Sequence, residues 1–70
     1  MKLGQLREAL TAAGWTCGEP PGLSHVHEWW DRAAPLTRTL LLPVDATTEL
    51  GRYRLGRATA RARELGVLRD

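Results

Sequence analysis

Apolar residues near the start of the chain recur at the three- and four-residue spacing of an amphipathic helix. They are Leu3, Leu6, Leu10 and Ala13. Gly14 follows where a residue in the left-handed conformation commonly ends a helix. We therefore predict a helix from about Lys2 to Ala13, with Trp15, just past the glycine, in the core.

Three short extended segments follow this helix. Residues 15–17 alternate like a strand, and the run Gly-Glu-Pro-Pro-Gly at 18–22 interrupts it, because proline cannot donate to a sheet. Residues 23–30 resume the extended pattern, 31–35 are typical of a hairpin loop, and 36–42 are rich in β-formers. We predict a meander of three antiparallel strands.

A second helix is predicted near the end of the chain. Asp45, Thr47 or Thr48 can cap it, and it continues through Leu65 to Gly66. Its apolar positions fall within a stripe of about 80° that we expect to pack on the sheet. They are Leu55, Ala58, Ala62 and Leu65. Gly51 and Gly56 each weaken a helix by roughly 1 kcal/mol, so we expect an irregular or delayed start before Leu55.

Together these elements predict a two-layer α+β fold of order α-β-β-β-α, with two helices on one face of a three-stranded antiparallel sheet. This architecture resembles the double-stranded-RNA-binding fold. We expect residues 1–70 to form a single domain. A chain of this size buries only about 60% of its unfolded surface, so its core is thin and often depends on a partner.

Two histidines two residues apart, His25 and His27, are the main candidates for chemistry. Alternate side chains of a strand share a face, so both would project together, with their Cα atoms roughly 6.5 to 7 Å apart. Imidazole can exchange a proton near neutral pH. A metal site built from these histidines and Cys17 lacks the spacing of a structural zinc motif, and we expect no metal or cofactor.

Adjacent tryptophans on a strand point to opposite faces, which separates Trp29 from Trp30. Trp30 shares a face with Val26, whereas Trp29 accompanies the two imidazoles. We therefore predict that Trp30 lies in the core and that Trp29 is available to an RNA base or to a protein partner.

Positive charge is concentrated in the last third of the chain. Residues 49–70 contain six arginines and three acids, a net charge of +3, whereas residues 1–48 carry −1. Arg54, Arg57 and Arg61 fall together beside the apolar stripe of the second helix. Guanidinium groups suit phosphate, so this cluster indicates RNA or an acidic partner, with a merely solvated face as the alternative.

Compartment is indicated by three further features. The single cysteine, Cys17, excludes an intramolecular disulfide framework and favours a reducing compartment. No apolar run approaches the ~20 residues of a membrane span, and Met1 to Gln5 lack the apolar core of a secretion signal. We expect a soluble, cytoplasmic protein without membrane contact.

Several local motifs, spread over nearly the whole chain, resemble the HicA toxins, which cleave mRNA and are held by HicB antitoxins. They are Gly14-Trp15 after the first helix, Gly22-Leu23-Ser24-His25 followed by Trp29 or Trp30, Leu42-Pro43, and the basic helix ending at Gly66. The resemblance implies that His25 is the catalytic histidine and that an antitoxin is a partner. Two departures are Leu23, inserted before Ser24-His25, and Val44-Asp45, which replace a histidine often found after the proline.

RNA carries its own nucleophile, the 2′-hydroxyl, so its cleavage needs a base, an acid and a cation near the phosphate, without requiring a metal. His25 is the candidate base, His27 the candidate acid, and Arg57 or Arg61 the candidate charge stabiliser. RNA-binding candidates are Arg54, Arg57, Arg61 and Trp29. The alternative function is a non-catalytic interaction protein, a phage-type inhibitor or small subunit that uses an exposed tryptophan and the arginine-rich helix.

Overall fold

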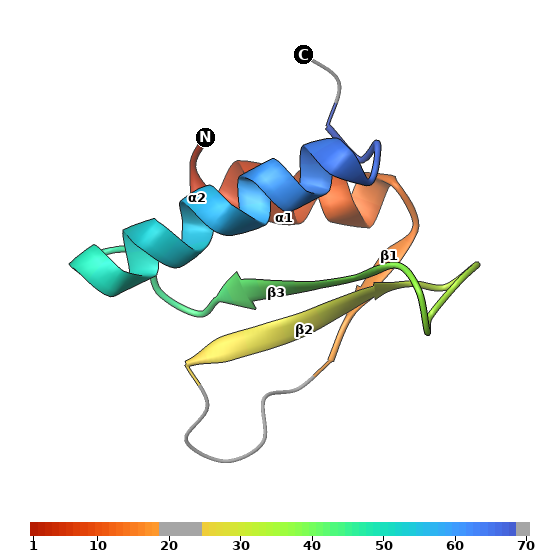
Figure 1. Ribbon diagram of the computed structural model, residues 1–70, viewed down its shortest axis with the longest axis horizontal. Coiled ribbons are helices and arrows are strands. Elements are labelled where there is room, and N and C mark those ends of the chain that lie inside the picture. The colour runs from red at the N-terminus through yellow and green to blue at the C-terminus, as the bar shows by residue number, and fades with distance from the viewer. Residues whose placement is uncertain (19–24, 69–70) are drawn as a thin grey trace.

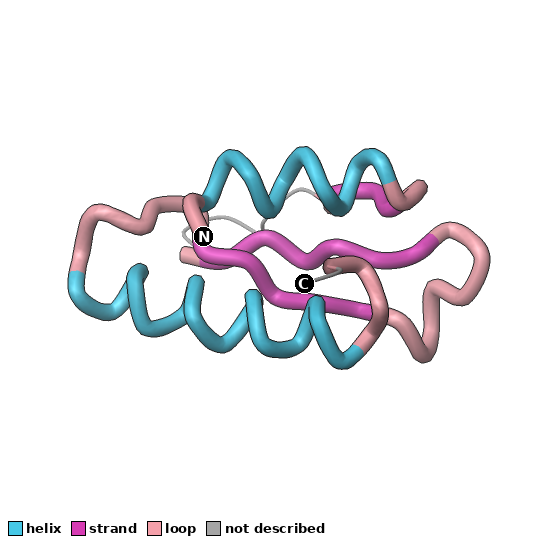
Figure 2. The backbone as a smooth tube through the Cα atoms, turned by 90° about the horizontal axis from the view of Figure 1, so that it is seen from above, coloured by secondary structure: helices cyan, strands magenta, loops and turns pink. Residues whose placement is uncertain are grey.

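Two helices cover one face of a three-stranded sheet in the computed structural model, which describes residues 1–18 and 25–68 (Figure 1). The elements are α1 (Leu3–Ala12), β1 (Trp15–Cys17), β2 (Val26–Asp31), β3 (Thr39–Pro43) and α2 (Glu49–Glu64). The strands pair antiparallel in the order β1-β2-β3. Seen from above, α2 runs along the β3 edge of the sheet, and α1 runs along the other edge (Figure 2). The predicted α+β class and element order are confirmed. The predicted start of the second strand at Leu23 lies outside the described residues.

Both helices end at glycines in the left-handed region, as predicted from the sequence. The φ angles are +87° at Gly14 and +78° at Gly66. The Gly14 amide donates to the Thr11 carbonyl at 3.1 Å, and the Val67 amide donates to the Ala62 carbonyl at 2.9 Å. A side chain at either glycine would strain this conformation, so these two positions determine where the helices stop.

The first turn of α2 is regular, and the expectation of an irregular start before Leu55 is wrong. Thr48 is the N-cap, and its hydroxyl accepts from the Gly51 amide at 2.9 Å. Gly51 is buried, and a Cβ built there would collide with the Asp45 carbonyl. Glycine is therefore present because the incoming loop passes against the helix, and the close contact outweighs its low helix propensity.

The connection between β2 and β3 covers residues 32–38, longer than the predicted 31–35. Asp31 organises it: one carboxylate oxygen accepts from the Ala33 amide at 3.0 Å, and the other accepts from Arg38 Nε at 2.8 Å. Strand β3 consequently begins at Thr39 rather than at Leu36, which is 94% exposed. These side-chain hydrogen bonds favour a compact turn, so residues 36–38 belong to the loop and do not extend the strand.

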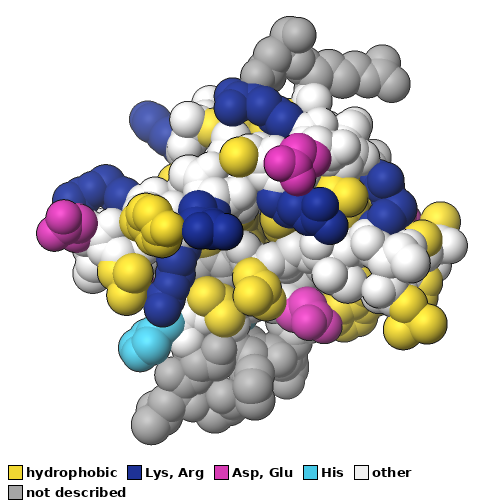
Figure 3. Space-filling view, viewed as in Figure 1, with side chains coloured by type: hydrophobic (Ala, Val, Ile, Leu, Met, Phe, Trp, Pro, Cys, Tyr) yellow, Lys and Arg dark blue, Asp and Glu magenta, His cyan; other side chains and the backbone are white. Residues whose placement is uncertain are grey.

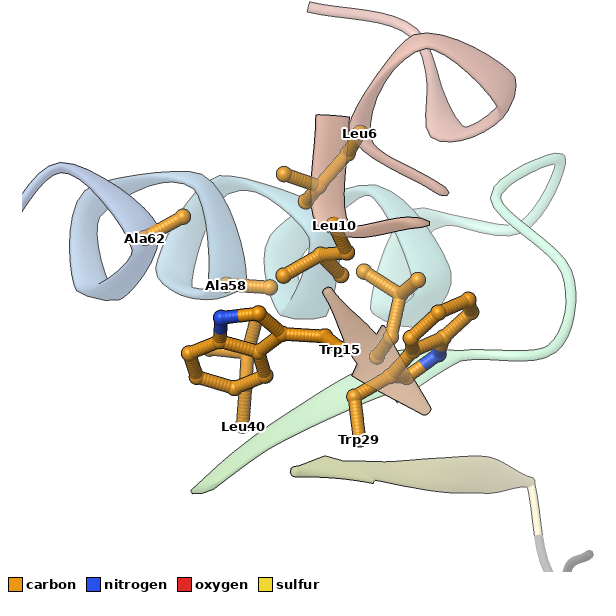
Figure 4. Close-up of a cluster of buried hydrophobic side chains, with 8 residues drawn as sticks. Leu6, Leu10, Trp15, Trp29, Leu40, Ala58 and Ala62 are labelled. Atoms are coloured by element: carbon orange, nitrogen blue, oxygen red, sulfur yellow. The ribbon is translucent and has the colours of Figure 1, made fainter. Parts of the chain in front are cut away.

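The core lies between the sheet and the helices (Figure 4). It consists of Leu6, Leu10, Trp15, Trp29, Leu40, Leu42, Ala58 and Ala62, and Leu55 and Leu65 pack against it. The predicted burial of Trp15 is confirmed, as is the predicted apolar stripe of α2. The prediction that Trp30 is the core tryptophan is wrong, because Trp29 is only 7% exposed and belongs to this cluster.

Strand register explains this correction. Trp29 pairs with Leu40, and directly paired residues share a face, so Trp29 lies on the face that carries the buried leucines of β3. Trp30 pairs with Thr39 on β3 and with Thr16 on β1, which places it on the face that the helices leave open. There its ring covers Gly18, where an added Cβ would lie only 3.0 Å from the ring carbon Cη2.

Candidate active site

A hollow of about 380 Å³ lies where the start of β2 meets the start of α2. Its lining residues are His25, Val44, Asp45, Thr48, Leu50, Gly51 and Arg54. His25 is exposed and directly precedes β2, where its carbonyl accepts from the Val44 amide at 3.0 Å. This bond extends the β2–β3 pairing by one step and fixes the His25 backbone at the end of the sheet. The volume is sufficient for a small ligand such as a nucleotide.

His25 is exposed, and its backbone carbonyl is held by the Val44 amide. By strand alternation, His25 lies on the same helix-covered face as Trp29. The His25 side chain would be buried if the core extended to the start of β2. The core residues of β2 and β3 end at Trp29 and Leu42, and His25 lies beyond them. His25 is therefore exposed although it lies on the same face as the buried Trp29.

Among the described residues, the ionisable side chains of this hollow belong to His25, Asp45 and Arg54. The Asp45 carboxylate accepts from the Thr47 amide at 2.9 Å and from the Thr47 hydroxyl at 2.8 Å. These bonds lower the pKa of Asp45, so the carboxylate stays ionised and is already hydrogen-bonded. No ion pair joins Arg54 to a carboxylate within the described part of the chain. Arg54 is thus the cation of the hollow with free donors for an anion.

The structure does not bring His27 into this hollow. His27 is half-buried opposite Leu42, and its Nδ1 lies 3.6 Å from the Cys17 sulfur. Burial raises the pKa of the Cys17 thiol, an effect that the charge of Arg7 partly offsets. The thiol donates to the Gly18 carbonyl at 3.3 Å, and its sulfur also lies close to Nδ1, so His27 and Cys17 form a local pair between β1 and β2, separate from His25.

The three arginines predicted to act together occupy one flank of α2 but serve two hollows. Arg54 lines the His25 hollow, whereas Arg57 and Arg61 line a second hollow along β3. Lys and Arg side chains gather over this side of the molecule, with hydrophobic side chains between them (Figure 3). The two ends of the flank therefore present different surroundings to a ligand.

Tyr53 is an exposed aromatic that sequence reasoning overlooked. Its side chain is 59% exposed, and its hydroxyl accepts from Arg57 Nη1 at 3.1 Å. The Arg57 guanidinium carbon lies 5.9 Å from the centroid of the Tyr53 ring. The sequence could have indicated this contact, because residues four positions apart in a helix, such as Tyr53 and Arg57, lie next to each other. Trp29, predicted to fill the role of exposed aromatic, is buried.

Comparisons with protein-family models, with curated proteins and with solved structures found no match for this chain. Within residues 1–18 and 25–68, no group of three or more His, Cys, Asp or Glu side chains is placed to hold a metal ion. Neither described helix has the length and apolar character needed to cross a membrane.

Proposed function

We propose that this protein is a HicA-like toxin that cleaves single-stranded RNA in the His25 hollow. The observation that carries the proposal is an exposed imidazole on a fixed backbone position beside a cation with free donors, in a hollow of nucleotide size. An anionic ribose phosphate fits this combination of a proton acceptor and a guanidinium.

The reaction divides between these two side chains. His25 takes the proton of the ribose 2′-hydroxyl, and the 2′-oxygen then bonds to the adjacent phosphorus. The bond from phosphorus to the 5′-oxygen breaks, and this oxygen takes a proton from water. Arg54 stabilises the extra negative charge on the phosphate oxygens in the transition state. The products are a 2′,3′-cyclic phosphate and a 5′-hydroxyl end.

Tyr53 takes over the stacking role that the sequence assigned to Trp29. It directly precedes Arg54 on α2, and its ring is exposed. A base stacked on an aromatic ring contributes about 1 to 3 kcal/mol without sequence preference. A cytoplasmic location and an antitoxin partner that covers the hollow belong to the same proposal.

The test is incubation of the purified protein with a long unstructured RNA, followed by analysis of the product ends. Wild-type protein is expected to produce 2′,3′-cyclic phosphate and 5′-hydroxyl ends. His25→Ala is expected to lower the cleavage rate by about 10² to 10⁴, the usual contribution of a positioned acid or base. Its melting temperature should stay near that of the wild type, because the His25 side chain is exposed.

His27→Ala is the matched control, since it removes an imidazole that lies outside the hollow and should retain cleavage. Expression in a bacterial host gives an independent readout, because wild-type protein should arrest growth and His25→Ala should not. Cleavage by His25→Ala at the wild-type rate would overturn the proposal, and so would products with 3′-hydroxyl ends.

A further inference from the structure

Strand β3 forms an open edge of the sheet. The Asp31 amide donates to the Arg38 carbonyl, and the Val44 amide donates to the His25 carbonyl, both at 3.0 Å. In an antiparallel pair the residues that bond to the partner strand alternate, so positions 40 and 42 also face β2. The backbone groups of Thr39, Leu41 and Pro43 therefore point away from the sheet.

This edge offers a regular set of unpaired backbone groups. Thr39 and Leu41 each present an amide and a carbonyl, whereas Pro43 presents only a carbonyl. No other described residue bonds to the outward groups of Thr39 and Leu41. An open edge with this alternation is a template for an added strand.

A basic groove follows the same edge. Its lining residues are Glu28, Thr39, Leu40, Leu41, Arg57, Ala58 and Arg61. Arg57 and Arg61 are exposed on the helix side, and the 58%-exposed Leu41 lies on the open side with Glu28. Among the described residues, the only ion pair made by these two arginines joins Arg61 to Glu64 at 3.4 Å. Both guanidinium groups keep donors for a ligand.

We infer that this groove binds an extended acidic segment of a partner protein, which adds a fourth strand to the sheet at β3. Successive side chains of such a strand point to opposite faces. Those on the helix side meet Arg57 and Arg61, whereas those on the open side meet Leu41. The groove therefore selects a segment in which acidic and apolar residues alternate.

Charge argues for this occupant over a second copy of the chain. Pairing β3 with β3 of another copy would bring Arg57 and Arg61 toward their own counterparts, and like charges at short range oppose association. Binding at this groove does not depend on RNA cleavage, because His25 and Arg54 line the other hollow.

The test uses a labelled synthetic peptide of sequence SEVEVEVS, with binding to the full chain followed by fluorescence anisotropy. Two versions carry N-methyl groups on alternate backbone amides, one set on the Glu residues and one on the Val residues. Only one set can face β3, so one version should lose binding and the other should retain it. This comparison leaves the protein unchanged and tests backbone pairing directly.

The arginines are tested by the double variant Arg57→Ala/Arg61→Ala, which should weaken peptide binding at least about fivefold. The matched control is Arg52→Ala/Arg63→Ala, which removes equal charge from residues that line a different hollow with Met1 and Leu55. This control should weaken peptide binding less than about twofold, because salt screens exposed charges that do not contact the peptide.

Three results would overturn the inference. The first is no binding of the peptide, which would leave the arginines as charges that protect the edge from self-pairing. The second is equal binding of both N-methylated peptides. The third is displacement of the peptide by single-stranded RNA with the same dependence on Arg57 and Arg61, which would identify the groove as a nucleic-acid surface.

Discussion

Trp29 combines deep burial with an unsatisfied polar atom. Its indole Nε1 is buried and has no hydrogen-bond partner among the described residues. An unpaired buried donor costs about 1 to 3 kcal/mol, so the hydrophobic contribution of the ring must exceed this cost. Contacts with Leu40 and the helices supply that contribution.

We predict that Trp29→Ala lowers the free energy of unfolding by about 3 to 5 kcal/mol, enough to unfold a domain of this size. Trp30→Ala should cost only about 1 to 2 kcal/mol, because its half-buried ring loses less apolar contact. Urea denaturation followed by circular dichroism measures both. Trp29→Phe serves as the control and should be much milder than Trp29→Ala, since it removes the unpaired N–H and keeps most of the ring. A larger loss for Trp30→Ala would contradict the assignment of faces.

The orientation of the tryptophans shows where single-residue reasoning failed. Alternation correctly separates Trp29 from Trp30, because it is a property of any strand. Which face is covered depends on the register with β3, where Trp29 meets Leu40. That pairing depends on how the β2–β3 hairpin closes, and the apolar neighbour Val26 was a poor guide because it lies at the end of the strand.

At the level of elements, the end of the β2–β3 hairpin is tied to the C-terminus of α2 by Arg38. Its Nε donates to Asp31, its Nη2 donates to the Leu65 carbonyl at 2.8 Å, and its guanidinium lies 5.7 Å from the Trp15 ring centroid. A cation at a helix C-terminus also offsets the partial negative charge of the last carbonyls. One side chain thus joins the sheet, the helix and the core.

We predict that Arg38→Ala lowers the free energy of unfolding by about 1 to 2 kcal/mol, because it removes charged hydrogen bonds that are partly exposed. Backbone and side-chain bonds lower the pKa of Asp31 in the folded state, from the Ala33 amide first and Arg38 second. This stabilisation is present above the unfolded pKa and is lost as pH falls through the folded pKa. Arg38→Ala should therefore reduce the loss of stability between neutral and acidic pH, measured by thermal melts. Arg32→Ala, in the same loop, is the control; an equal effect there would contradict the special role of Arg38.

The elements differ in how well the sequence predicted them. Helix ends and the apolar stripe of α2 follow from local signals, so Gly14, Gly66 and Ala62 were assigned correctly. The start of β3 and the regular first turn of α2 depend on specific contacts across a loop, as at Asp31 with Arg38 and at Gly51 with Asp45, which periodicity and propensity do not indicate. For the same reason the sequence could group Arg54 with Arg57 and Arg61 but could not assign them to separate hollows.

On the scale of the whole molecule, the modest net charge of +2 conceals three arginines that line two hollows on one side of α2. A single-stranded RNA that follows only the His25 hollow would contact Arg54, whereas an acidic peptide along β3 would contact Arg57 and Arg61. Salt dependence separates the two, since each phosphate contact contributes about −0.7 to the log–log slope of RNA affinity against salt.

We predict that Arg54→Ala flattens this slope by about 0.7, whereas Arg57→Ala/Arg61→Ala leaves it nearly unchanged while weakening the acidic peptide. The measurement is anisotropy titration of a labelled uridine-rich RNA at several salt concentrations, on a His25→Ala background so that the RNA stays intact. Arg52→Ala is the control for general loss of charge. Equal flattening by Arg54→Ala and by the double variant would mean that RNA spans both hollows. The positive flank of α2 would then be one continuous RNA surface. The assignment of RNA to Arg54 and of the acidic peptide to Arg57 and Arg61 would be wrong.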